Sequence, residues 1–422
     1  MSLKSITMNL IRKPLHLSNT DMDLSQITHI MPDEVFAGEV GLNESAKENI
    51  WSAVEQLYKT GTQPAISMCL RKNGKVLLHR SIGHASGNGP ADNEATPKVV
   101  AQADMPVCLY SASKAVTALV MHKMAEQGAV NLLDPVSFYL PEFAKNGKAN
   151  ITLHQVLSHR GGIPGLPRNV PLETIYDVDK AWELLCESKP ITVDGSKLAY
   201  HAITGGFVFQ QVVKKVMGVS IQEYLDQHFR QPMGMKYFTY GLDKEYQPDA
   251  ATNYATGPNP PFPLSLLVKR ALGASFSEAA EISNDYRWMD TCLPAANIYA
   301  SAEEISRFYQ MLLNRGEWNG KQILQPETVI RAVHPYGEFT FDRTMMIPMR
   351  YSAGLMLGAN PVGMWGRNTE NAYGHIGLIN KMCWADPDRD IAVSILTTGL
   401  ALVSHHIPYL MKLMHVINKE CR

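Results

Sequence analysis

A serine and a lysine three residues apart form the pattern most able to do chemistry in this sequence. Ser111 and Lys114 open a stretch that runs to Gly128 and is dominated by Ala, Val, Leu and Met. Such residues form helix readily, and side chains three apart lie on one face of a helix. A hydroxyl held beside an amine at the positive end of a helix is a candidate activated nucleophile. Because Ser-x-x-Lys is a short pattern, an ordinary helix N-cap is the alternative reading.

A serine nucleophile needs a base that takes its proton. Lys114 can do this only as a neutral amine, so its pKa of about 10.4 must be lowered by burial or by another cation. Tyr200 is a second candidate, since a phenol near that lysine could relay the proton. It is one of 17 tyrosines, and without further evidence a buried structural tyrosine is the simpler interpretation. The residues alone leave the choice of base open.

The helix that would position Ser111 and Lys114 is predicted to lie in the interior. Its apolar residues cover almost every side of the helix, which is typical of a buried helix. These positions are 115, 116, 118, 119, 120, 121, 124 and 125.

Strand patterns lie near both ends of the chain, and helix patterns lie between them. An Asn73-Gly74 pair between two apolar runs predicts a β-hairpin over residues 65–78. Further strands are predicted at residues 351–357, 372–376, 381–385 and 391–397. Helices are predicted at residues 43–60, 110–128, 153–157, about 170–235, 301–313 and about 400–418, with capping boxes at Ser220 and Ser301. Loops are predicted at 84–105 and 256–290, and a long irregular segment such as the second is usually a lid or pocket wall.

This pattern predicts an α/β protein of the α+β type. One sheet is built from both ends of the chain and flanked by helices, and a mostly helical subdomain is inserted. We expect an N-terminal arm at residues 1–42 and a single catalytic domain at 43–422. Within that domain, the sheet subdomain takes residues of about 43–105 and 300–422, and the helical subdomain takes about 106–299.

The composition excludes several classes of protein. The chain has 39 basic and 40 acidic residues among 422, a balance that argues against nucleic-acid binding and against a polybasic membrane binder. Its six cysteines are scattered without zinc spacing, so we expect reduced thiols and no metal site. No apolar run is long enough to span a membrane, and the N-terminus does not resemble a signal peptide. A cytoplasmic location is therefore expected, or a periplasmic one if a leader has been removed.

Four motifs resemble, in order and spacing, those of the serine β-lactamase and penicillin-binding protein superfamily. The similarity is to its branch of class C β-lactamases, family VIII carboxylesterases and serine peptidases, and it covers residues of about 43–400. The motifs are Ser111-Ala112-Ser113-Lys114, the loop Leu157–Pro164, Tyr200-His201-Ala202 and the strand Tyr373–Gly377, with Ala385–Asp388 continuing as that branch does. The resemblance implies the β-lactamase/DD-peptidase fold, with an antiparallel sheet.

The resemblance also implies a role for each matching residue. Ser111 would attack a carbonyl and form an acyl-enzyme, while Lys114 and Tyr200 would move its proton. The backbone N–H groups of Ser111 and Leu378 would form the oxyanion hole. His375, Gly377 and His201 would contact substrate, although packing is an equal alternative for His201.

Two departures from the superfamily pattern bear on the substrate. Ala202 stands where the superfamily has an asparagine that binds a substrate amide, and His375 stands where it has a lysine that holds a substrate carboxylate. Both changes weaken recognition of β-lactams and D-Ala-D-Ala peptides and favour esters. Leu378-Ile379-Asn380 replaces smaller residues, which predicts a narrow or apolar pocket there. His159 is interpreted as a residue that orders its loop.

The sequence thus predicts a serine hydrolase, a carboxylesterase for small or medium acyl esters with weak β-lactam hydrolysis. Three alternatives stay open: a β-lactamase or DD-peptidase, an acyltransferase to a metabolite alcohol, and a catalytically silent binding relative. No cofactor or metal is expected, and the partner is a small ester or amide. The sequence does not predict the oligomeric state.

Overall fold

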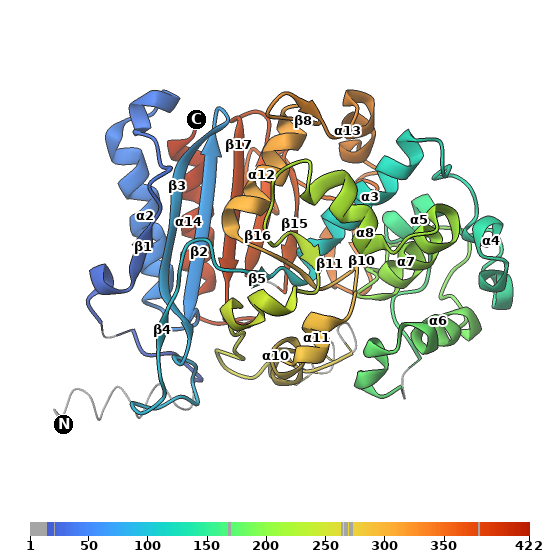
Figure 1. Ribbon diagram of the computed structural model, residues 1–422, viewed down its shortest axis with the longest axis horizontal. Coiled ribbons are helices and arrows are strands. Elements are labelled where there is room, and N and C mark those ends of the chain that lie inside the picture. Colours follow the sequence, from blue (N-terminus) through green and yellow to red (C-terminus); the bar gives the residue numbers. More distant parts are fainter. Residues whose placement is uncertain are drawn as a thin grey trace.

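An eight-stranded antiparallel sheet forms the centre of the protein (Figure 1). The computed structural model describes residues 15–20, 22–167, 170–262, 265, 269, 273–378 and 380–422. In spatial order the strands are β1 (Thr28–Ile30), β3 (Lys75–Ser86), β2 (Ala65–Lys72), β17 (Ile391–Thr397), β16 (Lys381–Asp386), β15 (Tyr373–Gly377) and β12 (Met356–Leu357), with β4 (Val99–Val100) paired to β3. Strands from the two ends of the chain meet where β2 pairs with β17, as the sequence predicts.

Helices cover both faces of this sheet. Helices α2 (Glu44–Tyr58) and α14 (Ile407–Glu420) pack together on one face, and α12 (Ala302–Leu313) packs against β2, β16 and β17 on the other. Alternation along β17 explains both layers, because Val393 and Ile395 join the cluster under α2 and α14 while Ala392 and Leu396 join the other. The remaining helices gather beyond the α12 face (Figure 1).

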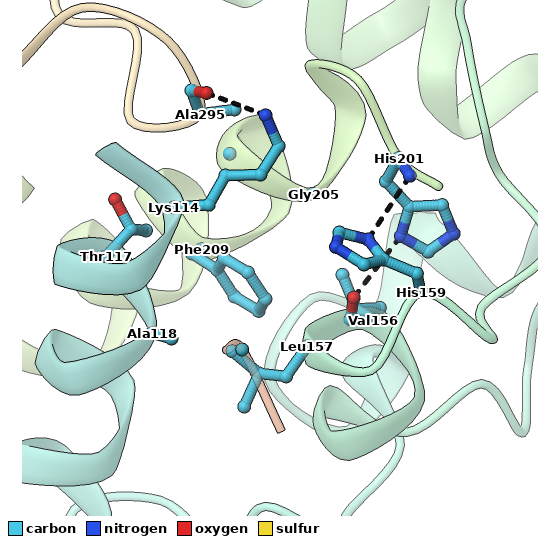
Figure 2. A pocket seen from close by; sticks show the side chains of 12 residues that line it. Lys114, Thr117, Ala118, Val156, Leu157, His159, His201, Gly205, Phe209 and Ala295 are labelled. Atoms are coloured by element: carbon cyan, nitrogen blue, oxygen red, sulfur yellow. Dashed lines mark hydrogen bonds between the residues drawn. The ribbon is translucent and has the colours of Figure 1, made fainter. Parts of the chain in front are cut away.

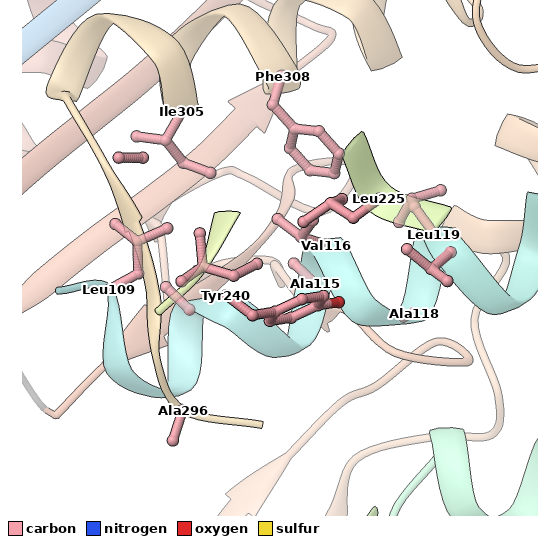
Figure 3. Close-up of a cluster of buried hydrophobic side chains, with 14 of the residues drawn as sticks. Leu109, Ala115, Val116, Ala118, Leu119, Leu225, Tyr240, Ala296, Ile305 and Phe308 are labelled. Carbon is pink, nitrogen blue, oxygen red and sulfur yellow. The ribbon is translucent and has the colours of Figure 1, made fainter. Parts of the chain in front are cut away.

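Helix α3 (Ser113–Glu126) runs through the core, preceded by one turn of 3₁₀ helix, η3 (Tyr110–Ala112). All its residues from Ala115 to His122 are buried, which confirms the predicted interior helix. Ala115, Val116 and Leu119 lie among side chains from several other elements, including Tyr240 and Phe308 (Figure 3). The helix ends before Gly128, whose φ of +72° an L side chain rarely adopts.

The predicted hairpin turn and helix caps are confirmed, because hydrogen bonds between residues a few positions apart determine the backbone there. Asn73 and Gly74 both have positive φ, 52° and 77°, and turn β2 into β3 as a hairpin. Ser220 and Ser301 each accept a hydrogen bond from the N–H three residues on, within the predicted capping boxes.

Three predicted segments are wrong in part, one because of a distant contact and two because of local proline and glycine residues. The strand predicted at 351–357 shrinks to β12, because Gly354 adopts a φ of +117° and its backbone presses against Ala118 of α3. Helix α14 begins at Ile407, with Pro408 in its first turn, so residues 400–406 are not helical. Between α6 (Val178–Glu187) and α7 (Thr204–Met217), residues 188–203 are irregular, because Pro190 and Gly195 interrupt the predicted helical region.

Two predicted loops contain secondary structure. Residues 84–105 contain the end of β3 and all of β4. Residues 276–290 form α10 (Phe276–Ser283) and α11 (Tyr286–Asp290), which begin at side-chain caps on Ser275 and Asp285. Part of the 256–290 segment, and Ile379 of the predicted narrow pocket, lie outside the described residues.

The N-terminal segment contributes to the sheet. Residues 28–30 of the predicted arm form edge strand β1, which pairs with β3, and residues 1–14 lie outside the described part of the chain. The division into an arm and two subdomains stays a prediction. No helix of the described residues is long and apolar enough to cross a membrane. All six cysteines are described, and each is a free thiol.

The remaining helices and strands lie outside the central sheet. The helices are α4 (Val136–Tyr139), α5 (Leu153–Leu157), α6 (Val178–Glu187), α7 (Thr204–Met217), α8 (Ile221–Leu225) and α13 (Pro326–Val333). The short 3₁₀ segments are η1 (Leu24–Gln26), η2 (Ala37–Val40), η4 (Pro141–Gly147), η5 (Leu172–Tyr176) and η7 (Lys244–Asp249), and η6 (Asp226–Arg230) is π-helical. The small strands are β5 (Val107–Cys108), β6 (Thr239–Tyr240), β7 (Ile298–Ala300), β8 (Glu317–Trp318), β9 (Lys321–Gln322), β10 (Thr340–Asp342), β11 (Ile347–Met349), β13 (Val362–Gly363) and β14 (Gly366–Arg367).

Candidate active site

Ser111 and Lys114 meet at the start of helix α3. The Lys114 Nζ lies 3.1 Å from the Ser111 Oγ, as expected for side chains one turn apart. Ser111 is not the N-cap of α3, because Ala112 holds that position and no side chain caps the helix. Tyr110, directly before Ser111, has a φ of +47°, a conformation that is strained for a bulky residue. Such strain is often found at functional sites.

Lys114 is held in an environment that disfavours its charge. Its Nζ donates a hydrogen bond to the Ala295 carbonyl at 2.8 Å, and burial holds its pKa well below the usual range. Lys114 also borders a cavity of about 20 Å³, with His159, Phe209 and Gly205 on other sides (Figure 2). A cavity of this size has room for about one water molecule. Burial therefore shifts Lys114 toward the neutral amine, the form that can accept a proton.

Tyr200 approaches the same two residues from the irregular segment before α7. Its hydroxyl lies close enough to that of Ser111 to influence its pKa, and the Lys114 Nζ lies 4.9 Å from the centre of its ring. Burial raises the pKa of Tyr200, while the Ser111 hydroxyl acts in the opposite direction. The phenol thus keeps its proton under ordinary conditions. The structure brings Ser111, Lys114 and Tyr200 together.

Strand β15 forms the neighbouring side of the site. A Cβ on Gly377 would lie 2.0 Å from the Leu109 carbonyl oxygen, so only glycine lets the chain before Ser111 lie this close to the strand. Leu378 follows with a φ of +33°. The η3 turn, which contains Ser111, packs against β15. The close packing at Gly377 therefore brings the predicted oxyanion-hole residues Ser111 and Leu378 into the same neighbourhood.

His375 is fully buried beside Tyr200, with the two ring centres 6.2 Å apart. Its Nδ1 lies 2.7 Å from the Ile376 carbonyl oxygen, which assigns the ring proton to Nδ1. The Nε2 atom has no hydrogen-bond partner among the described residues. Burial and then the nearby Lys114 lower the pKa of His375 to about 3, so this side chain is neutral at physiological pH.

His159 and His201 tie the 157–164 loop to the segment that carries Tyr200. The His201 N–H donates to the His159 Nδ1 at 3.2 Å, and the His201 Nδ1 lies 3.2 Å from the Val156 carbonyl oxygen (Figure 2). The remaining His201 nitrogen, Nε2, accepts from the Ile163 N–H at 3.4 Å. Both ring nitrogens of His201 are thus engaged by backbone groups, and its contact with substrate stays a prediction.

The loop histidines are neutral for the same physical reason as His375. Burial lowers the pKa of His201 to about 3 and holds that of His159 well below its usual range. The His159 ring also contacts the Tyr200 ring, with centres 4.5 Å apart. This contact with Tyr200 was not predicted from the sequence. The hydrogen bond from Lys114 to the Ala295 backbone carbonyl was not predicted either, because an alanine in the sequence does not indicate such a contact.

Comparisons with known proteins agree with this geometry. The model of the Beta-lactamase family matches residues 52–408. Esterase/beta-lactamase LipL of Mycobacterium tuberculosis is 28% identical over 313 residues, which cover 71% of this chain and 70% of LipL. A penicillin-binding protein homolog from Caulobacter crescentus superposes with a TM-score of 0.75 at 22% identity, covering 90% of this chain and 99% of the homolog. A family VIII carboxylesterase superposes with a TM-score of 0.74 at 23% identity, covering 89% of this chain and 98% of that enzyme. These two structures share the fold.

Proposed function

The chain belongs to the beta-lactamase family of serine hydrolases, and on that premise we propose that it is a carboxylesterase that forms an acyl-enzyme on Ser111. The observation that carries this proposal is the pairing of the Ser111 hydroxyl with a buried Lys114 amine 3.1 Å away. A neutral amine at this distance can accept the serine proton as the carbonyl is attacked.

The proposed acylation step uses Lys114 and Tyr200 for opposite tasks. As Ser111 Oγ bonds to the acyl carbon, its proton passes to the Lys114 Nζ, and the ester C–O bond then breaks. The departing alkoxide takes a proton from the Tyr200 hydroxyl, which is replenished from Lys114. Water then attacks the acyl-enzyme with the same groups acting in reverse, releasing the carboxylic acid and Ser111.

The negative charge on the acyl oxygen would be stabilised by the backbone N–H groups of Ser111 and Leu378. A donor of this kind contributes about 3 kcal/mol to the transition state in other hydrolases. The close packing of Gly377 against Leu109 supports this role, because it holds the two backbone segments together.

The residues around the site support an ester rather than a β-lactam as substrate. His375 is neutral, and because its ring proton lies on Nδ1 and is donated to the Ile376 carbonyl, its free Nε2 can only accept a hydrogen bond. It therefore offers neither a charge nor a donor to a substrate carboxylate. Ala202 offers no amide to a substrate peptide bond. We propose that His375 and Gly377 contact the acyl portion of a small or medium ester, with His201 behind them. Weak β-lactam hydrolysis is consistent with the name of LipL, which covers both activities.

Comparing two chromogenic substrates tests this function. We expect kcat/KM for a p-nitrophenyl butyrate ester to exceed that for a chromogenic cephalosporin by on the order of 100-fold or more, because groups that would bind the cephalosporin are missing. Ser111→Ala is the control and should abolish turnover of both. Equal or faster cephalosporin turnover would instead support the β-lactamase alternative. If the ester is cleaved only when a second alcohol is added, the protein is an acyltransferase.

A further inference from the structure

A buried aspartate on a distant hairpin contacts the backbone of Tyr200. Asp342 ends strand β10, which pairs with β11 through a turn at residues 343–346. Its side chain is fully buried. Its Oδ1 accepts three backbone hydrogen bonds, from Tyr200 at 3.1 Å, Thr344 at 2.8 Å and Met345 at 3.0 Å. The last two bonds hold the turn of its own hairpin, whereas the first reaches across the molecule.

Other contacts strengthen the connection between this hairpin and the Tyr200 segment. The Arg343 N–H donates to the Leu198 carbonyl at 3.0 Å, two residues before Tyr200. The second carboxylate oxygen of Asp342 and the hydroxyl of Tyr351 are both buried without a hydrogen-bond partner among the described residues. Burial and then the nearby Asp342 raise the pKa of Tyr351. Tyr351 in turn contacts the His159 ring, with centres 5.0 Å apart. The hairpin therefore holds the segment that carries Tyr200 through hydrogen bonds to residues 198 and 200.

A carboxylate in this position is costly to bury. Removing a charged group from water is unfavourable unless hydrogen bonds compensate, and here three N–H groups converge on one oxygen. A hairpin turn alone would need only the two local bonds, which an exposed Asp or Ser supplies in many turns. The burial of Asp342 and its bond to Tyr200 therefore require an explanation beyond the turn itself.

We infer that Asp342 is a positioning residue, whose carboxylate fixes the Tyr200 backbone so that the phenol stays in contact with Ser111 and Lys114. The inference rests on the proposed function, because Tyr200 matters only if it moves a proton. The charge of Asp342 also acts on the phenol itself. After burial, it is a further cause that raises the pKa of Tyr200, which keeps the phenol protonated.

Two substitutions separate the bond to Tyr200 from the rest of the side chain. Asp342→Asn keeps an oxygen at the Oδ1 position and replaces the unpartnered Oδ2 by an amide nitrogen. Asp342→Ser has a hydroxyl that can hold the local turn but is too short to reach Tyr200. Asp23→Ser is the matched control, since Asp23 also accepts a backbone N–H, from Ser25 at 3.0 Å, far from the site.

We expect Asp342→Ser to lower kcat for a p-nitrophenyl ester on the order of 100-fold with KM little changed, as small displacements of a catalytic group do. Asp342→Asn should recover most of the lost kcat, and Asp23→Ser should match the wild type. Thermal unfolding shows whether each variant is folded at the assay temperature. If Asp342→Ser unfolds there, Asp342→Thr takes its place with the same expected loss, because its hydroxyl is equally short and its methyl group fills part of the lost volume.

A double-mutant cycle with Tyr200→Phe then separates positioning from general structural support. If Asp342 acts through Tyr200, Asp342→Ser lowers kcat no further once the phenol hydroxyl is absent. An additional loss of similar size in the Tyr200→Phe background would overturn the inference. So would an Asp342→Ser variant with wild-type kcat.

Failure of the proposed function gives a different result. In that case the wild type neither cleaves esters nor reacts with a fluorophosphonate at Ser111. A crystal structure of Asp342→Ser then tests, independently of any activity, whether Asp342 positions Tyr200. A Tyr200 hydroxyl displaced from Ser111 supports it, and an unmoved hydroxyl overturns it.

Discussion

The Lys114 Nζ lies 4.9 Å from the centre of the Tyr200 ring, so an amine from helix α3 faces a phenol from the segment before α7. Burial shifts the two groups in opposite directions, lowering the pKa of Lys114 and raising that of Tyr200. Pairs whose environments separate their pKa values in this way indicate an acid and a base. We therefore propose Lys114 as the group that takes the serine proton and Tyr200 as the group that supplies one.

Replacing Lys114 tests this division. Lys114→Arg and Lys114→Met should each lower kcat for an ester by about 10² to 10⁴, because an arginine stays charged and a methionine has no nitrogen. In the wild type, kcat/KM should rise with pH as Lys114 loses its proton, and this rise should lie well below the pKa of an ordinary lysine. A pH profile of kcat/KM measures it. Near-normal activity of Lys114→Arg would contradict the assignment, since that variant cannot supply a neutral base.

Substituting Gly377 tests whether close packing holds the site together. In Gly377→Ala the added methyl would meet the Leu109 carbonyl, and the chain before Ser111 must shift to make room. We expect a lower thermal midpoint and a kcat reduced on the order of 100-fold, because the nucleophile and the oxyanion-hole donors separate. Gly165→Ala is the control, since an added methyl there meets nothing within 4 Å. A fully active Gly377→Ala variant would show that this contact does not position the site.

The three buried histidines predict how stability depends on pH. His159, His201 and His375 have lower pKa values in the folded protein than in the unfolded chain, so the unfolded chain binds more protons below about pH 6.5. Their contribution to the free energy of unfolding is complete above that pH. It is lost as the pH falls, by roughly 1 kcal/mol per pH unit for each group.

Urea unfolding at several pH values between about 4 and 8 measures this slope. His201→Asn should give a shallower slope than the wild type, whereas His415→Asn, which changes an exposed histidine of α14, should leave it unchanged. A free energy of unfolding that stays constant on acidification would contradict the buried neutral state of these rings.

The parts of the site that depend on neighbours in the chain could be predicted from the sequence. Helical geometry places Ser111 beside Lys114, and the Asn73-Gly74 turn and the Ser220 and Ser301 caps follow from local hydrogen bonding. Such contacts depend on residues a few positions apart. They are therefore visible in a sequence without knowledge of the fold.

Contacts between distant segments could not be derived in this way. The Ala295 carbonyl on Lys114 and the Asp342 carboxylate on Tyr200 join residues far apart in the chain, through a backbone group and a hairpin without a distinctive pattern. Gly354 shows the same limit in the fold, because its contact with Ala118 interrupts a segment whose own residues favour a strand. Tyr200 was found only through the resemblance to a family, and not from its own surroundings in the sequence.

The most direct test is to identify the residue that a fluorophosphonate probe labels. The protein is mixed with a fluorophosphonate ester analogue, digested, and examined by peptide mass spectrometry, with Ser111→Ala treated in parallel. We predict one adduct per chain on Ser111, none in Ser111→Ala, and loss of ester turnover in proportion to labelling. An adduct on another residue, or ester turnover retained by a folded Ser111→Ala variant, would contradict the account.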